Sequence, residues 1–295
     1  MNQKNQKFGI LFLGVVILTW GANVGIIKSA YKDFHPLLFA AIRFTLSGVL
    51  LLAATFWREG GLALQREDLG KVVLVGGLGV GLYQILWSLG LNLTSASNSA
   101  LILSTAPLLG ALYVDLKKEE PVGRREYGGM LLALAGVVLV ILRPTVRLEF
   151  SLDTLIGDLL TLMASFCWAI IFSVGSKPLL KTYSPLRLMG YCMVIGAVVL
   201  WGGALMTAPK FIWEDVGGKA WCALGYAVVF SGILGHVFWY EGINRVGVTK
   251  TLISSYFIPL WAVLFNTLLM GEKIFLQQVF GGVLILLGVH YALRK

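Results

Sequence analysis

Ten aromatic or polar side chains interrupt the long apolar stretches of this sequence, and their types suit the binding of an organic molecule. Indole and phenol rings offer flat apolar walls, whereas amide, imidazole and guanidinium groups offer hydrogen bonds that orient a ligand. Because polar groups inside apolar helices usually face the bundle interior rather than lipid, we expect these side chains to line a shared cavity. The candidate binding residues are Trp20, Asn23, Arg43, Tyr83, Gln84, Trp87, Trp168, His236, Trp239 and Tyr256.

Two of these residues carry more specific chemistry. Arg43 lies about two helical turns inside an apolar segment, where it either serves the structure by snorkelling or bonding carbonyls, or attracts an anionic group. His236 is either a satisfied polar core residue or a group that couples a proton, because imidazole titrates near neutral pH.

Pro107 and Pro259 each fall near the middle of an apolar segment. Proline removes one intrahelical hydrogen bond and kinks or loosens the helix. We expect two kinks, which are either purely structural or shape the cavity and flex during gating.

The chain repeats itself at an interval of half its length. A shift of 152 residues aligns Gln84 with His236 and Trp87 with Trp239, so each half presents a polar group one turn before an indole. The same shift aligns Pro107, Glu120, Gly129 and Gly136 with Pro259, Glu272, Gly281 and Gly288. A period this long indicates duplication, and we expect two halves, residues 1–148 and 149–295.

Composition indicates an integral membrane protein. The chain is 57% hydrophobic and 13% charged, whereas soluble proteins average about 25% charged. A net charge of +9 would favour nucleic acid in a soluble chain, but here the bases lie in short loops, so we expect a lipid bilayer and no nucleic acid as partner. Crossing the hydrocarbon takes roughly 20 helical residues. Ten segments qualify, at 8–30, 36–57, 71–92, 97–116, 126–143, 156–177, 186–207, 219–242, 247–270 and 275–292.

The distribution of Lys and Arg predicts the orientation. With the N-terminus inside, sixteen bases lie on the cytoplasmic side and seven outside, so both termini are expected in the cytoplasm. Five helices per half is an odd number, and the second half therefore runs in the opposite sense. Inverted repeats commonly place a substrate site near the bilayer midplane, open to each side in turn.

Acids near the helix ends suggest local structure. Glu241 precedes Arg245 by four residues and predicts an ion pair. Glu120, directly before Pro121, and Glu272 are expected at helix N-termini, where the helix dipole favours an acid.

Enzyme motifs are missing from the sequence. There is no nucleophile elbow, zinc-protease motif or Walker loop, and the three histidines and three cysteines show no metal-ligand spacing. We expect no catalytic residues, no cofactor and no metal, and any pumping must use a gradient.

The chain resembles the EamA family of the drug/metabolite transporter superfamily. The resemblance rests on Trp20-Gly21-Ala22-Asn23, Pro36 through Arg43-Phe44, Pro259-Leu260, Gly271-Glu272, Gly281-Gly282 and Gly288-Val289. It implies ten helices in two inverted five-helix repeats, an inner-membrane location in a bacterium or archaeon, and export of small metabolites. The implied cavity is bounded mainly by helices 1, 3, 4 and 6, 8, 9. Related small multidrug exporters use a helix-1 glutamate, but residues 8–30 contain no acid, so their coupling mechanism cannot be transferred.

Together these observations predict an all-α inner-membrane secondary transporter that exports amino acids or their derivatives by alternating access. Aromatic walls would hold the apolar part of the substrate, while Asn23, Arg43, Gln84 and His236 orient its polar part. An exporter of cationic drugs or polyamines is the alternative, disfavoured because no buried acid is evident. From another class, a non-transporting membrane sensor or scaffold remains open. A monomer is expected, with a dimer as the other arrangement.

Overall fold

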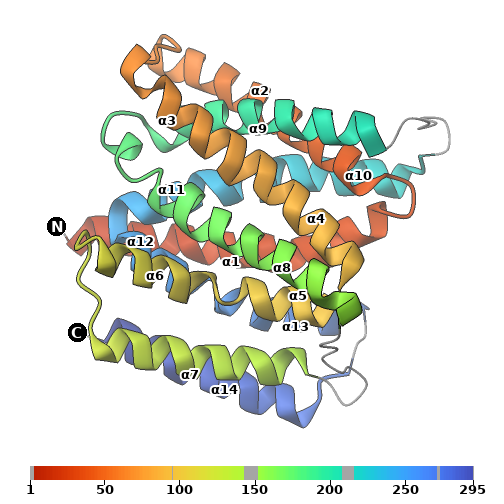
Figure 1. Cartoon of the computed structure of the whole chain (residues 1–295), viewed down its shortest axis with the longest axis vertical. Coiled ribbons are helices and arrows are strands. Elements are labelled where there is room, and N and C mark those ends of the chain that lie inside the picture. The colour runs from red at the N-terminus through yellow and green to blue at the C-terminus, as the bar shows by residue number, and fades with distance from the viewer. Residues whose placement is uncertain (1–2, 95, 143–151, 208–215, 271–272, 295) are drawn as a thin grey trace.

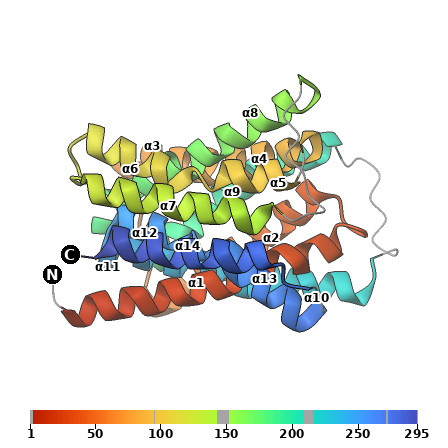
Figure 2. The same cartoon turned by 90° about the horizontal axis from the view of Figure 1, so that it is seen from below.

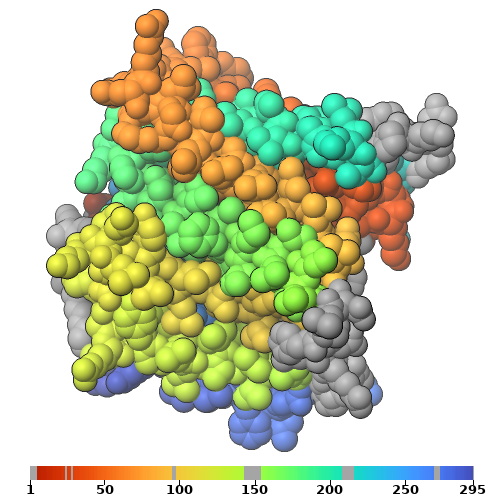
Figure 3. All heavy atoms as spheres, viewed as in Figure 1, coloured from red at the N-terminus to blue at the C-terminus, as the bar shows by residue number. Residues whose placement is uncertain are grey.

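The fold is a bundle of helices, described by a computed structural model for residues 3–94, 96–142, 152–207, 216–270 and 273–294. These residues contain helices and turns but no strand. Both ends of the described chain lie at the same end of the bundle (Figures 1 and 2). Side chains fill most of the space between the ribbons on the face shown in Figure 3.

The described residues of the first half contain nine helical elements. They are α1 (Gln3–Ala30), α2 (Pro36–Glu59), η1 (Arg66–Asp68), α3 (Leu69–Leu74), η2 (Val75–Leu82), α4 (Tyr83–Leu93), α5 (Ala96–Leu103), α6 (Ala106–Leu116) and α7 (Arg124–Ile141). The second half contains α8 (Leu152–Phe166), η3 (Cys167–Val174), η4 (Leu179–Lys181), α9 (Pro185–Thr207), α10 (Gly218–Tyr226), η6 (Ala227–Leu234), α11 (Gly235–Val246), α12 (Val248–Ser254), α13 (Phe257–Met270) and α14 (Leu276–Leu293).

The predicted fold class, an all-α integral membrane protein, is confirmed. Nine segments of the described chain are long and apolar enough to cross a membrane. The tenth expected helix is α7, which has 18 residues and begins with Arg124, Arg125 and Glu126. Helix ends differ from the predicted ones by a few residues, because polar residues such as Arg66 and Glu67 extend helices beyond their apolar runs.

Three stretches of the described residues are π-helical, a feature that the sequence pattern does not predict. They are η2, η3 and η6. The first and last lie 152 residues apart, at residues 75–82 and 227–234. A π-helical turn bonds residue i to i+5 and is frequent at functional sites.

Two helices are interrupted shortly before the aligned prolines Pro107 and Pro259. The chain turns at Ser104 and Thr105 between α5 and α6, and at Ser255 and Tyr256 between α12 and α13. Pro107 then lies in the first turn of α6, where a missing N–H costs little. Side-chain hydroxyls donate to nearby carbonyls at both breaks, from Thr105 to Ile102 O at 2.6 Å and from Ser255 to Leu252 O at 2.7 Å. Pro259 lies two residues after the start of α13. Each of the two expected kinks is therefore a break in the helix shortly before the proline.

Helices α7 and α14 pack with their backbones in direct contact (Figures 1 and 2). A Cβ added to Gly129 would lie 2.5 Å from Gly288 O, and one added to Gly136 would lie 2.5 Å from Gly281 O. Small residues allow such close approach in membrane proteins. Residue numbers rise along α7 as they fall along α14, so the two helices run antiparallel.

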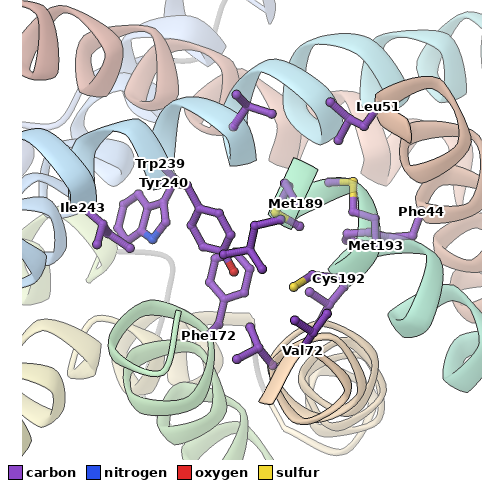
Figure 4. Packing of buried hydrophobic residues seen from close by; sticks show 14 of the residues in the cluster. Phe44, Leu51, Val72, Phe172, Met189, Cys192, Met193, Trp239, Tyr240 and Ile243 are labelled. Carbon is purple, nitrogen blue, oxygen red and sulfur yellow. The ribbon is translucent and has the colours of Figure 1, made fainter. Parts of the chain in front are cut away.

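The largest apolar core joins helices from both halves. Helix α2 packs along α9, η2 packs against α9, and η3 packs against η2. Figure 4 shows Phe172, Tyr240 and Cys192 within this core, and the rings of Phe172 and Tyr240 stack with centroids 4.9 Å apart. Glu272, which aligns with Glu120, and the expected boundary at residues 148 and 149 lie outside the described residues.

Candidate functional site

Four of the predicted binding residues meet where α1, η3 and α11 converge. The Trp20 ring centroid lies 5.3 Å from Trp168, 5.1 Å from His236 and 5.2 Å from Trp239. Trp168 lies 5.3 Å from Trp239 as well. We call Trp20, Trp168, His236 and Trp239 the aromatic cluster. Tyr83 extends it from α4, with its ring 5.3 Å from that of Trp168.

Ser231 anchors the polar side of the aromatic cluster. Its carbonyl oxygen accepts a hydrogen bond from Trp20 Nε1 at 3.0 Å and another from His236 Nδ1 at 2.9 Å. The carbonyl of Gly232 is 3.0 Å from the same imidazole nitrogen. Because carbonyls only accept, Nδ1 carries the hydrogen, and Nε2 is the acceptor in the neutral ring.

Ser231 was not among the predicted site residues. It belongs to η6, as does Gly232, and the π-helical turn there changes which carbonyl groups are open to neighbours. A polar residue in the apolar run Val228–Ile233, five residues before His236, was the available signal. The repeat obscured it, because the aligned residue in the first half is Gly79.

Arg43 reaches the same serine from α2. It is 6% exposed, and its Nη2 donates to Ser231 Oγ at 2.8 Å. Its Cζ lies 4.9 Å from the centroid of the Phe44 ring, which in turn lies 5.7 Å from the His236 ring. The Nε atom is buried without a hydrogen-bond partner. Arg43 therefore does not snorkel, since its charged group is held inside the protein.

A second serine, Ser173, forms hydrogen bonds with Trp239 and Trp168 of the aromatic cluster. Trp239 Nε1 donates to Ser173 Oγ at 3.2 Å, and Ser173 Oγ donates to Trp168 O at 2.9 Å. Trp239 has no exposed surface. In this conformation the indole of Trp239 is fully buried and presents no open surface. Ser173 is a further residue that was not among the predicted site residues.

The remaining predicted residues lie outside the aromatic cluster. Gln84 is buried on α4, and no hydrogen bond or ring contact within the described chain joins it to the cluster. Trp87 packs against Leu86 and the α8–η3 junction, and lines a small cavity of about 40 Å³. Asn23 is half-buried on α1, with an unpartnered Oδ1. Tyr256 belongs to a separate apolar core with α7 and α14, and its hydroxyl is buried without a partner.

A larger cavity of about 260 Å³ lies between α7, α13 and α14. Its lining is apolar apart from Gln278, whose Nε2 donates to Val140 O at 3.2 Å. It shares no lining residue with the aromatic cluster. The sequence did not predict this cavity.

An ionic cluster joins the two halves near the start of α12. Glu120 is 2.9 Å from Lys177 Nζ and accepts bonds from Val248 N at 3.3 Å, Thr249 N at 3.3 Å and Thr249 Oγ1 at 3.0 Å. Burial alone would raise the pKa of Glu120, but Lys177 and the Thr249 donors outweigh it and hold the pKa below its usual value. Glu120 does lie at a helix N-terminus, although the helix is α12 rather than the one that follows it in sequence.

The predicted ion pair on α11 is confirmed. Arg245 Nε lies 2.6 Å from Glu241 Oε2. The guanidinium also covers the Phe12 ring on α1, at 5.3 Å from its centroid.

At the aromatic cluster the described residues offer ring faces and hydrogen-bonding groups. Among them, no three His, Cys, Asp or Glu side chains come together as a metal site. The aromatic cluster offers ring faces, an imidazole and, through Ser231, a guanidinium, which can hold an organic molecule with both apolar and polar parts.

Comparison with known proteins identifies the family of the chain. The model of the EamA-like transporter family matches residues 7–142 and 155–294. The uncharacterized transporter YyaM of Bacillus subtilis (strain 168) is 30% identical over 287 residues, which cover 97% of this chain and 93% of the relative. An uncharacterized transporter of Archaeoglobus fulgidus is 29% identical over 299 residues, covering 100% and 99%.

Two further similarities concern a named transporter and a solved fold. A protein of Chlamydia trachomatis serovar L2 named S-adenosylmethionine/S-adenosylhomocysteine transporter is 24% identical over 274 residues, covering 90% of this chain and 82% of that protein. A crystal structure with 21% identity superposes with a TM-score of 0.83 over 98% of this chain and 97% of that one. The chain therefore belongs to the EamA-like transporter family and is a multi-pass membrane transporter.

Proposed function

We propose that this protein is an inner-membrane secondary transporter that exports amino acids or their derivatives by alternating access. The observation that carries the proposal is the aromatic cluster, because Trp20 comes from the first half and Trp168, His236 and Trp239 come from the second. A site built from both halves changes shape when the halves move against each other.

The halves are proposed to be inverted repeats, residues 1–148 and 149–295. The reciprocal glycine contacts of the antiparallel pair α7 and α14 support this arrangement. So do the aligned π-helical segments η2 and η6 and the breaks that precede the aligned prolines Pro107 and Pro259. We place both termini in the cytoplasm, following the excess of Lys and Arg there.

The polar contacts suggest how the halves separate and rejoin. The Trp20 bond to Ser231 O crosses between the halves and must break for α1 to leave η6. At the predicted cytoplasmic end, Glu120 joins the loop after α6 to α12 and Lys177. We propose that these contacts open alternately and that the helix breaks before the two prolines flex as they do so.

The substrate class follows from the side chains at the site. Ring faces suit an apolar group, while His236 and Arg43 suit polar or anionic groups. The name of the Chlamydia trachomatis relative refers to two amino-acid derivatives, which supports the same class. A cationic drug or polyamine is disfavoured, since no carboxylate within the described residues pairs with Arg43 or replaces it at the aromatic cluster.

Counterflow in proteoliposomes tests the proposal. Liposomes that contain the protein and an unlabelled amino-acid mixture should accumulate labelled amino acids from outside, and Trp20→Ala should reduce that accumulation at least about tenfold. Trp57→Ala is the matched control, because Trp57 is 86% exposed on α2. If the wild-type protein moved no amino acid or derivative, the substrate class would be wrong. If it moved no organic solute at all, a sensor or scaffold would be favoured.

A further inference from the structure

Arg43 is a buried cation without a counter-ion. No Asp or Glu carboxylate of the described chain lies within 4.0 Å of its guanidinium. Its one side-chain hydrogen bond within the described residues is from Nη2 to the neutral hydroxyl of Ser231, at 2.8 Å. The Nε donor is buried and unpaired, and the Phe44 ring covers part of the group at 4.9 Å from Cζ.

This environment is unfavourable for the charge that it holds. A guanidinium stays protonated at any physiological pH, so it cannot escape the cost of burial by losing a proton. Removing a cation from water is tolerated when an anion or several acceptors take the place of the water. One hydroxyl and one ring face replace the lost water only weakly, and no negative group among the described residues pairs with the guanidinium.

Ser231 connects this cation to the aromatic cluster. Its hydroxyl accepts from Arg43, which leaves the hydroxyl hydrogen free to donate, and its carbonyl accepts from Trp20 Nε1 at 3.0 Å. An anion at Arg43 would therefore receive bonds from a guanidinium and a hydroxyl while its organic part lay beside an indole.

We propose that Arg43 and Ser231 bind the carboxylate of the transported substrate. The fork of donors on a guanidinium matches the two oxygens of a carboxylate. The proposal rests on the transport function argued above and narrows its substrate class. The substrate is a carboxylate with an apolar body that stacks on Trp20 and Trp168, and simple amines and amides are excluded.

Four probes with the same phenyl group test this assignment on the purified full-length protein. They are 3-phenylpropionate, 3-phenylpropionamide, phenethylamine and L-phenylalanine. Isothermal titration calorimetry should show the two carboxylates binding at least about tenfold more tightly than the amide and the amine, which cannot accept from a guanidinium in the same way.

Variants then separate binding from a structural role. Arg43→Gln should lower the affinity for both carboxylates by about ten- to a hundredfold and leave the affinity for the amide unchanged. Arg43→Lys should have a smaller effect, since it keeps the charge and loses the fork. Arg58→Gln removes the same charge from the exposed end of α2 and should leave all four affinities unchanged.

Several outcomes would overturn the assignment. The first is equal affinity for the amide and the carboxylates. The second is that neither carboxylate binds when it is present at millimolar concentration and in 50-fold molar excess over the protein. The third is that Arg43→Gln lowers the melting temperature but leaves the carboxylate affinity unchanged. If Arg43→Gln does not fold, the probe comparison on the wild type and Arg43→Lys decides. If the wild type transported amines but no carboxylate in counterflow, the carboxylate assignment would be wrong and the proposed transport function would stand. If the wild type transported nothing, the proposed function itself would be wrong.

Discussion

Trp20 and His236 donate hydrogen bonds to one and the same carbonyl oxygen, that of Ser231, at 3.0 and 2.9 Å. The two donors use both lone pairs of the acceptor. The His236 bond lies within the η6–α11 helix, whereas the Trp20 bond joins α1 to η6 across 211 residues of sequence. Of these two bonds, only the tryptophan bond would break in the separation of the halves that we propose, because the His236 bond lies within one continuous helix.

Trp20→Phe should change transport more than stability. An aromatic ring remains, although it is smaller than the indole, and the N–H bond to Ser231 O is lost; the lost bond alone costs about 1 kcal/mol because His236 still occupies the carbonyl. Melting temperature and counterflow rate, measured side by side, check this expectation. Trp57→Phe is the exposed control on α2. A rate unchanged from the wild type would show that the indole N–H plays no part in the transport cycle.

His236→Asn and His236→Ala together separate proton coupling from structure. Asparagine can place an N–H where Nδ1 lies and keep the bond to Ser231 O, but it does not titrate. If His236 couples protons, both variants should lose the dependence of transport on a pH gradient while remaining monodisperse. A normal pH-gradient response in His236→Asn would instead assign the imidazole a structural role, as the donor to Ser231.

Glu120→Gln should destabilise the protein in a pH-dependent way. The pKa of Glu120 is held low in the folded state, so the stabilisation from its charge is present above the unfolded pKa of about 4.3 and is lost as pH falls through the folded value. We expect the substitution to lower the free energy of unfolding by about 1.5 kcal/mol at neutral pH, and this difference should shrink toward zero below the pKa of Glu120 in the folded protein. Melting curves at a series of pH values measure the difference. Glu67→Gln, at an exposed site, should show little effect; a constant difference at every pH would contradict the role of the charge.

Gly136→Ala should disrupt the packing of α7 against α14. A Cβ there would lie 2.5 Å from Gly281 O and 2.7 Å from Ile285 N, and these backbone atoms cannot rotate away. Forced separation of the helices should cost about 2 kcal/mol or more. Gly202→Ala on α9 is the control, since nothing lies within 4 Å of its added Cβ. Equal melting temperatures for the two variants would mean that the close approach is not needed.

Cysteine labelling should report the orientation of the bundle. Single cysteines at Leu62, Gly123 and Arg294 should react with an impermeant maleimide only from the cytoplasm, and one at Lys32 only from outside. The background must lack Cys222, which is exposed. Labelling of Lys32 from the cytoplasm, together with Arg294 from outside, would reverse the proposed topology.

The membrane class, the helical segments and the contacts between residues close in the chain can be predicted from the amino-acid sequence alone. Hydrocarbon thickness sets a helix length, so apolar runs predict spanning segments within a few residues. The Glu241–Arg245 pair was predictable for a similar reason, because four residues along a helix always bring side chains together. The polar and aromatic residues at membrane depth also pointed to Trp20, Trp168, His236 and Trp239 as residues of interest.

Which of these residues contact one another depends on how the helices pack in three dimensions. Arg43 and Ser231 are 188 residues apart, and their contact depends on how α2 and η6 are rotated and packed, which the apolar period of either segment leaves open. The same holds for Glu120, whose partners begin a helix in the other half. Tyr256 has the same residue type and predicted depth as Tyr83, yet it packs in a separate core. Composition fixes how well a segment suits lipid, whereas hydrogen-bond partners across a bundle depend on helix rotation, π-helical turns and glycine contacts that exist only once the helices are assembled.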